Sequence, residues 1–243
     1  MNRKQFLHRS ILLAAGSGLV KMAAGNTMVP STAGNELLVN AGIAGNNTNN
    51  LLKRIDTDCL VHKPTLTILM IGTNDMNNGK HVPLEKFRNN LNTLSDKIIG
   101  SGSQLLLMTI LPFYEPYLLQ RHPAAFFQPE GAEGRRMQVN EVIIKTAAER
   151  KAGLLDIGSI FEKVGKIGLE KDCLLRNKEN SGKEDGVHPT RDGYRFLALA
   201  VSQHIQYNQL DTRRIVCFGD SITKGDGSVD KESYPAYLKK LLS

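Results

Sequence analysis

Five short apolar runs alternate along the chain with longer amphipathic stretches, and this alternation limits the possible folds more than any other feature. Most of the runs are unbroken rather than alternating in polarity, as expected for parallel strands that are covered on both faces. The runs that we expect to be strands are residues 36–41, 66–71, 104–111, 154–157 and 214–218. The stretches that we expect to be helices are residues 48–55, 84–99, 134–151, 191–206 and 234–242.

This order of elements predicts the α/β class, with right-handed crossovers and a three-layer α/β/α sandwich around a parallel sheet. Pro83 and Pro189 stand just ahead of two predicted helices, where a missing amide hydrogen costs nothing. In open parallel sheets the ligand site lies beyond the carboxyl ends of the strands. Functional residues are therefore expected in the segments that follow the strands.

Residues 1–25 have the layout of a bacterial export signal rather than of part of the fold. They contain four basic residues and no acidic one, with an apolar stretch at 11–15 and small residues at 23–25. The segment that begins with Arg3 and Lys4 is similar to a twin-arginine signal with lysine in the second place. The alternative is an amphipathic N-terminal helix. We expect residues 26–34 to be a linker and residues 35–243 a single domain.

The net charge of the chain would by itself favour an anionic partner such as a nucleic acid. Lys and Arg number 31 against 24 Asp and Glu, a formal charge of +7. Residues 1–25 hold four of these basic residues, so the remainder carries only +3, and we expect no nucleic-acid partner. No apolar run approaches the ~20 residues of a membrane span, and no cysteine follows the apolar stretch of the signal. We therefore expect no stable membrane anchor and an exported protein, periplasmic or extracellular.

Four segments after predicted strands contain residue types that carry chemistry. They are residues 40–47 (NAGIAGNN), 72–75 (GTND), 185–189 (DGVHP) and 219–223 (GDSIT). Together they resemble the four blocks of the SGNH (GDSL-type) hydrolase family, which supply glycine, asparagine, Asp-x-x-His and serine. The resemblance covers residues 35–243. It implies a flavodoxin-like, five-stranded parallel sheet and a serine ester hydrolase that uses no cofactor.

The chemistry of three of these residues can be argued without the family. A serine hydroxyl such as that of Ser221 is a poor nucleophile until a base accepts its proton. His188 is the natural base, because a histidine changes protonation near neutral pH. Asp185 lies three residues earlier and can hold the imidazole in one tautomer. The alternatives are a turn-forming serine and an ordinary loop histidine.

The resemblance also implies an oxyanion hole. Its donors would be the backbone amides of Ser221 and Gly45 and the side-chain amide of Asn74. The alternative for Gly45 and Asn74 is a role as turn formers. We expect Asp75 and Asp220 to hydrogen-bond loop amides rather than to take part in chemistry.

Other motifs argue against competing classes. The Gly-x-Ser-x-Gly motif of the other large serine-hydrolase fold is absent around Ser221. The sequence has no H-E-x-x-H motif and no tight cluster of Cys and His, so no metal is expected. Cys217 lies in a predicted strand and is expected to be inert. Pairing of Cys59 with Cys173 after export stays open, since sequence does not give their distance.

The order of the blocks differs from that of the family, in which the serine block comes first. Here the serine block comes last, so the sequence resembles a circular permutant. Strands numbered along the chain would then lie in the order 1-5-2-3-4, with the last strand between the first two. The alternative is a tandem protein in which residues 214–243 begin a second hydrolase domain. The single occurrence of each block favours permutation.

The residues after the third predicted strand bear on the substrate. Residues 112–134 hold Phe113, Tyr114, Tyr117, Phe126 and Phe127 at the active edge, where they could form an acyl or leaving-group pocket. The alternative is an ordinary loop packed on a helix. Members of the family hydrolyse esters and some thioesters, and an exported enzyme with a short lid fits a deacetylase of oligosaccharides. A lysophospholipase or thioesterase, or a non-catalytic sugar- or lipid-binding relative, stays open.

Overall fold

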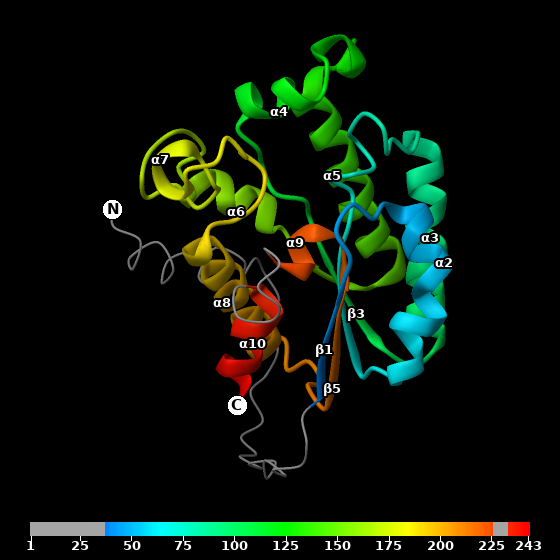
Figure 1. The fold of residues 1–243 in the computed structure, drawn as a ribbon. Helices are drawn as coiled ribbons and strands as arrows, with labels where there is room; N and C mark the ends of the chain where they lie inside the picture. Colours follow the sequence, from blue (N-terminus) through cyan, green and yellow to red (C-terminus); the bar gives the residue numbers. More distant parts are fainter. Residues whose placement is uncertain (1–36, 226–232) are drawn as a thin grey trace, which may run out of the picture. The chain divides into compact units, whose positions relative to one another are not determined.

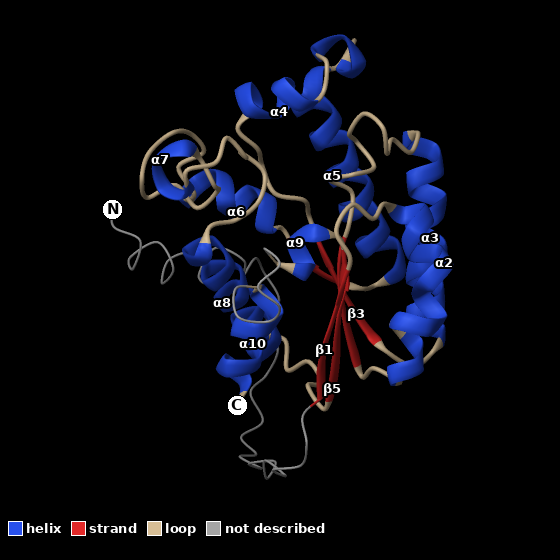
Figure 2. Ribbon diagram, in the orientation of Figure 1, coloured by secondary structure: helices blue, strands red, loops and turns tan. Residues whose placement is uncertain are grey.

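The computed structural model describes residues 37–225 and 233–243, and within them five parallel strands form one sheet (Figure 2). The strands are β1 (Leu37–Gly42), β2 (Leu66–Met70), β3 (Gln104–Met108), β4 (Gly153–Leu155) and β5 (Arg214–Gly219). Their order across the sheet is β1-β5-β2-β3-β4, as expected from the sequence. The predicted export signal and linker lie outside the described residues.

Helices cover both faces of the sheet and make a three-layer sandwich (Figure 1). One face packs on α2 (Thr48–Asp58), α3 (Leu84–Gly100) and α5 (Gly131–Arg150). The other face packs on α6 (Ile157–Val164), α8 (Arg191–Tyr207) and α10 (Tyr234–Leu242). Successive strand residues point to opposite faces, so Ile68 and Leu69 of β2 belong to different hydrophobic clusters. Covering both faces explains why the strands are unbroken apolar runs.

The C-terminal strand lies inside the sheet. Val216 of β5 is in register with Val39 of β1, and Cys217 is in register with Ile68 of β2. Residues 208–213 connect the end of α8 to β5 along the amino edge of the sheet, away from the carboxyl ends of the strands. A segment from the end of the chain therefore completes the centre of the sheet between two strands from its beginning.

Several short helices do not follow from the sequence patterns. They are α4 (Glu115–Arg121), α7 (Lys178–Ser181), α9 (Ser221–Lys224) and the 3₁₀ turns Leu60–His62 and Ala124–Phe127. The predicted strand 154–157 is wrong at its end: Asp156 caps α6 by accepting a hydrogen bond from the Ser159 amide, so Ile157 begins a helix. The apolar run thus spans a strand and the start of the following helix.

All three cysteines are free and buried. Cys59 packs in the cluster that contains α2 and lies near the Thr67 hydroxyl, whereas Cys173 packs in the cluster that contains α8. The two thiols belong to opposite faces of the sheet, so the disulfide that sequence left open does not form. No helix within residues 37–225 and 233–243 has the length and apolar character needed to cross a membrane.

Candidate active site

Ser221 stands where β5 turns into a short helix at the carboxyl edge of the sheet. Asp220 caps α9, its carboxylate accepting a hydrogen bond of 2.9 Å from the Ile222 amide, and Ser221 is the first residue of that helix. Ser221 therefore lies in a helical turn directly after the strand. A Cβ at Gly219 would collide with the Met70 carbonyl oxygen, so the strand can make this turn only with glycine. The Ser221 side chain is held on a rigid element and remains half-buried.

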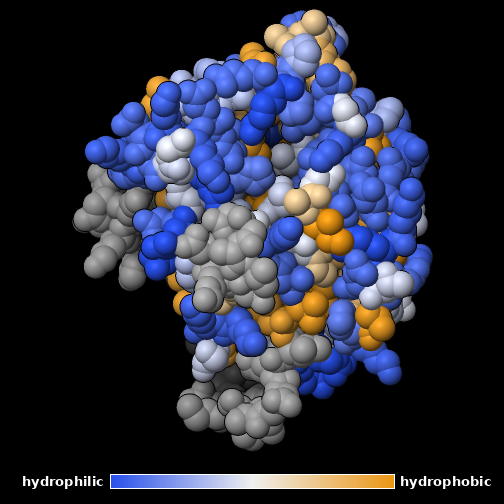
Figure 3. Space-filling view, in the orientation of Figure 1, coloured by the Kyte–Doolittle hydropathy of each residue, from blue (hydrophilic) through white to orange (hydrophobic). Residues whose placement is uncertain are grey.

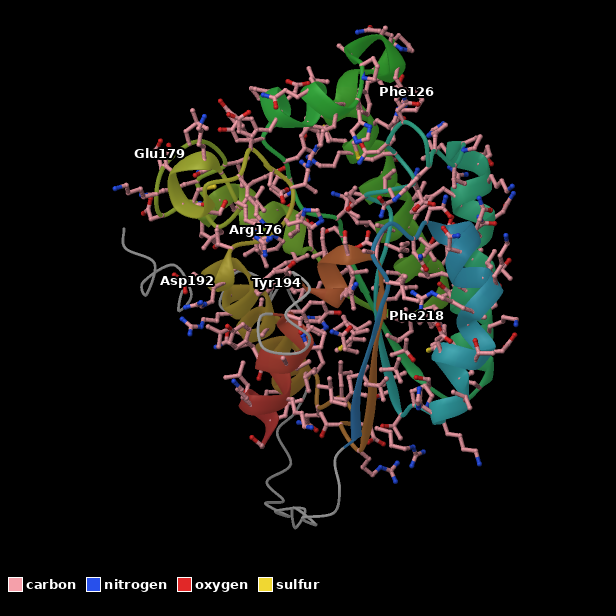
Figure 4. The ribbon with its side chains drawn as sticks, in the orientation of Figure 1. Phe126, Arg176, Glu179, Asp192, Tyr194 and Phe218 are labelled. Atoms are coloured by element: carbon pink, nitrogen blue, oxygen red, sulfur yellow. The ribbon has the colours of Figure 1, made fainter. Side chains whose placement is uncertain are left out.

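A second segment, residues 185–188, is held beside Ser221 by backbone pairing. Gly186 N–H donates to the Arg176 carbonyl (2.8 Å), and Arg176 N–H donates to the His188 carbonyl (2.9 Å); Figure 4 labels Arg176. Gly186 has a φ of +69°, and a Cβ there would crowd Tyr114 at the start of α4. This tight turn fixes the direction in which His188 leaves the backbone.

Ser221, His188 and Asp185 form one hydrogen-bonded chain. His188 Nε2 lies 3.0 Å from Ser221 Oγ, and His188 Nδ1 lies 2.9 Å from Asp185 Oδ2. Asp185 Oδ1 also accepts the amides of Val187 and His188, each at 3.0 Å. Burial alone would raise the pKa of Asp185, but the hydrogen bonds and the charge of His188 outweigh it and lower the pKa to about 2. The carboxylate is therefore ionised where it faces the imidazole.

The loops that carry Gly45 and Asn74 contact each other beside this chain. Asn74 Nδ2 donates to the Asn46 carbonyl at 2.9 Å, and the Ile43 amide donates to the Gly219 carbonyl at 3.2 Å. Gly45 has a φ of +78°, a conformation that favours glycine. An amide nitrogen carries two hydrogens, so Asn74 keeps one donor besides the hydrogen bond to Asn46. The structure brings all the predicted blocks to one edge of the sheet.

Arg54, which no sequence pattern singles out, joins two of these segments, residues 40–47 and 219–223. Its guanidinium donates to the carbonyl of Ala41 at the end of β1 (2.9 Å) and to that of Gly219 at the end of β5 (2.8 Å). Its Nε donates to the side chain of Asn46 at 2.7 Å. The guanidinium also stacks 4.5 Å above the ring of Phe218, which Figure 4 shows on the α2 side of the sheet. No local pattern distinguishes such an arginine from one on a helix surface.

Two buried carboxylates lie under the site. Asp75 Oδ1 accepts the Thr48 amide at 2.9 Å, at the start of α2, and Asp220 accepts the Ile222 amide. Both therefore hydrogen-bond backbone amides, as expected from the sequence. Burial is the main cause that raises the pKa of each carboxyl to about 6, against the hydrogen bonds, which lower it.

Replacing Asp220 with asparagine is expected to stabilise the protein at pH 8. The pKa of Asp220 is about 6 in the folded state, whereas aspartate in an unfolded chain titrates near 4. The free energy of unfolding of the wild type therefore decreases as pH rises from 4 to 6, because the buried carboxyl must ionise. An asparagine side chain at this position can keep the cap to Ile222 without a buried charge. In urea denaturation, the free energy of unfolding of the variant minus that of the wild type should be about 2–3 kcal/mol larger at pH 8 than at pH 4.

The matched control is Asp96→Asn, because the Asp96 carboxylate is exposed where it meets Arg150. This variant should leave the change in stability between pH 4 and pH 8 close to that of the wild type. An Asp220→Asn variant with the same pH dependence of unfolding as the wild type would contradict the raised pKa of Asp220.

The aromatic residues of 112–134 do not line one open pocket. Phe127 is buried in the core, and Phe126 packs edge-on against His81. Tyr114 and Tyr117 pack against each other with ring centroids 4.9 Å apart, and both lie beside residue 186. The remaining aromatic residue, Phe113, is partly buried against the core. Only the two tyrosines are thus placed next to the segment that carries His188.

The fold is a three-layer α/β/α sandwich, and Ser221, His188 and Asp185 are hydrogen-bonded in turn. This arrangement of a serine, a histidine and a carboxylate is typical of the class of serine hydrolases. The profile of the GDSL-like Lipase/Acylhydrolase family matches residues 13–196, and the chain belongs to this family. The matched stretch contains the Gly45, Asn74 and Asp185–His188 segments and ends before Ser221. The resemblance to the SGNH family in the sequence analysis is thereby confirmed.

Two bacterial proteins are similar to this chain in sequence. Acetylxylan esterase from Geobacillus stearothermophilus is 28% identical over 189 residues, which cover 72% of this chain and 75% of the esterase. YqeF, an uncharacterized lipoprotein of Bacillus subtilis (strain 168), is 35% identical over 104 residues. That match covers 39% of this chain and 43% of the lipoprotein, so the chain spans less than half the length of YqeF.

Solved structures of similar proteins share the fold. An acetyl xylan esterase, AlAXEase, superposes with a TM-score of 0.54 at 22% identity, over 68% of this chain and 79% of the esterase. A variant of Axe2, an acetyl xylan esterase from Geobacillus stearothermophilus, gives a TM-score of 0.53 at 25% identity, over 68% and 70% of the two chains. A lipase/acylhydrolase from Enterococcus faecalis gives 0.52 at 20% identity, over 69% and 74%.

Proposed function

We propose that this protein is a serine esterase that removes small acyl groups, acetyl above all, from carbohydrate, through an acyl-enzyme on Ser221. The observation that carries the proposal is the continuous hydrogen-bonded chain from Asp185 through His188 to the Ser221 hydroxyl. The substrate class, an acetylated oligosaccharide, is supported by the names of the similar esterases. No cofactor is part of the proposed reaction.

In the proposed mechanism, Ser221 Oγ attacks the ester carbonyl carbon while His188 Nε2 accepts the hydroxyl proton. The ionised Asp185 stabilises the imidazolium that forms. Collapse of the tetrahedral intermediate breaks the bond to the leaving alcohol, which takes the proton from His188. A water molecule then attacks the acyl-enzyme by the same route and releases the carboxylic acid.

The negative charge of the tetrahedral intermediate needs donors that are already oriented. We assign this role to the backbone amides of Ser221 and Gly45 and to the side-chain amide of Asn74. Contact between the loops of Asn74 and Gly45 supports the assignment, since it holds the two proposed donors close to each other. Arg54 ties the Gly45 loop to the end of β5 and is a positioning residue in this scheme.

A small acyl group and a polar leaving group fit the surroundings of Ser221 better than a lipid. Phe127 is buried in the core rather than exposed in a pocket, and hydrophilic residues cover most of the visible face over α4 and α7 (Figure 3). We place Tyr114 and Tyr117 beside the substrate on the side of His188, and Phe113 behind them. A lysophospholipase or thioesterase would need a larger exposed apolar surface.

Hydrolysis of p-nitrophenyl acetate, butanoate and octanoate by the purified chain tests this proposal, together with acetate release from acetylated xylo-oligosaccharides. We expect kcat/KM to fall by about tenfold or more from acetate to octanoate, because a site that accepts a small acyl group excludes a longer chain. A preference for octanoate would favour the lipase alternative. A folded protein that cleaves none of these esters would favour the non-catalytic binding alternative.

We also propose that the block order arises from circular permutation of the family's fold. Pairing of β5 with both β1 and β2 supports this, because a strand that began a second domain would not lie inside the first sheet.

We propose that residues 1–25 are an export signal. A linker at residues 26–34 and one domain at residues 35–243 would follow it. The description of YqeF as a lipoprotein supports export.

A further inference from the structure

The loop after β2 holds an ammonium group against Gly45. Asn47 Nδ2 donates to the Lys80 carbonyl at 2.8 Å, and the Lys80 amide donates to the Asn77 carbonyl at 3.2 Å, so the backbone of Lys80 is fixed on both sides. A Cβ on Gly45 would collide with Lys80 Nζ. The charged end of Lys80 therefore occupies the space beside one of the proposed oxyanion donors.

The end of α4 supplies further basic groups on the other side of the site. Arg121 Nη2 donates to the Asp185 carbonyl at 2.7 Å, and its side chain is 40% exposed. The next residue, His122, has a lowered pKa, first because of burial and then because the charges of Arg121 and Lys80 oppose its protonation. The charge of Lys80 thus acts on the end of α4. Lys80, Arg121 and His122 form what we call the basic rim.

Acidic groups near the rim are already engaged or lie elsewhere. Asp185 pairs with His188 and also lies 3.8 Å from Arg121 Nη1, and Glu130 pairs with Arg135 at 2.8 Å, so Lys80 is the member of the rim whose charge is not balanced by a carboxylate in the described residues. Glu115 is at the opposite end of α4 from Arg121. Within the part of the chain that the structure describes, Lys80 has no ion-pair partner. An exposed ammonium that no carboxylate neutralises has capacity to bind an anion from outside the protein.

We propose that the basic rim selects acetyl esters whose sugar carries a carboxylate near the ester, as in an acetylated uronic acid. This inference rests on the proposed function and narrows its substrate class. With the acetyl carbonyl at Ser221, the rest of the sugar lies over the edge formed by Gly45 and Asp185, where Lys80 and Arg121 can meet its carboxylate. A neutral sugar would gain nothing from these charges.

Two substrates that differ only in charge test the inference: an acetylated methyl glucuronoside and its glucuronamide analogue with the same acetyl position. For the wild type at low ionic strength, we expect kcat/KM to favour the carboxylate about fivefold, and high salt should reduce the preference. Lys80→Met should bring the ratio of the two kcat/KM values to within about twofold of one, whereas Lys80→Arg should keep the preference.

Lys239→Met is the matched control, because Lys239 is an exposed lysine at the end of α10, on the opposite edge of the sheet. It removes the same charge and should keep the wild-type ratio. p-Nitrophenyl acetate serves as a reference ester. If the protein cleaves p-nitrophenyl acetate but cleaves the two sugars equally well, or cleaves neither sugar, this inference is overturned. The proposal of ester hydrolysis would then still stand. A wild-type protein that cleaves none of the three esters overturns the proposed function as well.

Discussion

Replacing Ser221 with alanine is expected to lower kcat for p-nitrophenyl acetate by roughly 10⁵-fold or more, because the acyl-enzyme cannot form without Oγ. The backbone amide of residue 221 and the other proposed oxyanion donors remain, so some acceleration over water should persist. The fold should be preserved, since Ser221 begins a helix that Asp220 caps and, among the residues that the structure describes, its hydroxyl hydrogen-bonds His188 alone. Initial rates and circular dichroism of both proteins measure the two effects.

Labelling with a fluorophosphonate gives a second measurement of the same prediction. The wild type should gain one adduct, on the peptide that contains Ser221, and the alanine variant should gain none. Ser101→Ala is the matched control, because Ser101 is an exposed serine at the end of α3 whose hydroxyl donates to the Ile98 carbonyl. Hydrolysis that persists unchanged in Ser221→Ala would reject the mechanism.

Replacing Asp185 with asparagine is expected to lower kcat by about 10³–10⁴-fold near neutral pH, through the tautomer of His188. Asp185 Oδ1 accepts two backbone amides, so an asparagine would keep its carbonyl oxygen there. Its NH₂ group would then occupy the place of Oδ2, 2.9 Å from His188 Nδ1, and donate to that nitrogen. The ring proton would move to Nε2, which could no longer accept the proton of Ser221.

Asp185→Ala separates this tautomer effect from simple loss of charge. Alanine cannot donate to His188 Nδ1, so its kcat should be higher than that of the asparagine variant. Its free energy of unfolding should be lower, because the amides of Val187 and His188 lose their acceptor. The order of kcat and the order of stability should therefore be opposite in the two variants. Equal kcat values for both variants would contradict the tautomer argument.

Much of the sheet could be predicted because buried parallel strands leave a clear local pattern. All five predicted strands are present, and the predicted helix 234–242 has the same bounds as α10. The errors fall where local signals overlap. Residues 154–157 are one apolar run, yet the Asp156 cap divides it between β4 and α6. α9 has only four residues, too few to show helical periodicity.

The candidate site was predictable only in its residue types. Gly45, Asn74, Asp185, His188 and Ser221 follow from four short blocks, and their catalytic roles stay predictions. Arg54 was missed because its pairing with Asp58, four residues later, looks like an ordinary salt bridge on a helix surface. Lys80 was missed because an exposed lysine after a turn carries no local signal.

The sequence by itself determined which segments become buried strands and which polar residues stand at their ends, because burial and turn formation depend on neighbouring residues. Only the tertiary structure decided that Arg54 joins the carbonyls of two strand ends and that Lys80 rests against Gly45. Each of these facts joins residues far apart in the chain. A local sequence pattern indicates that a side chain is buried or polar, whereas the packing of the whole sheet determines which distant residue it contacts.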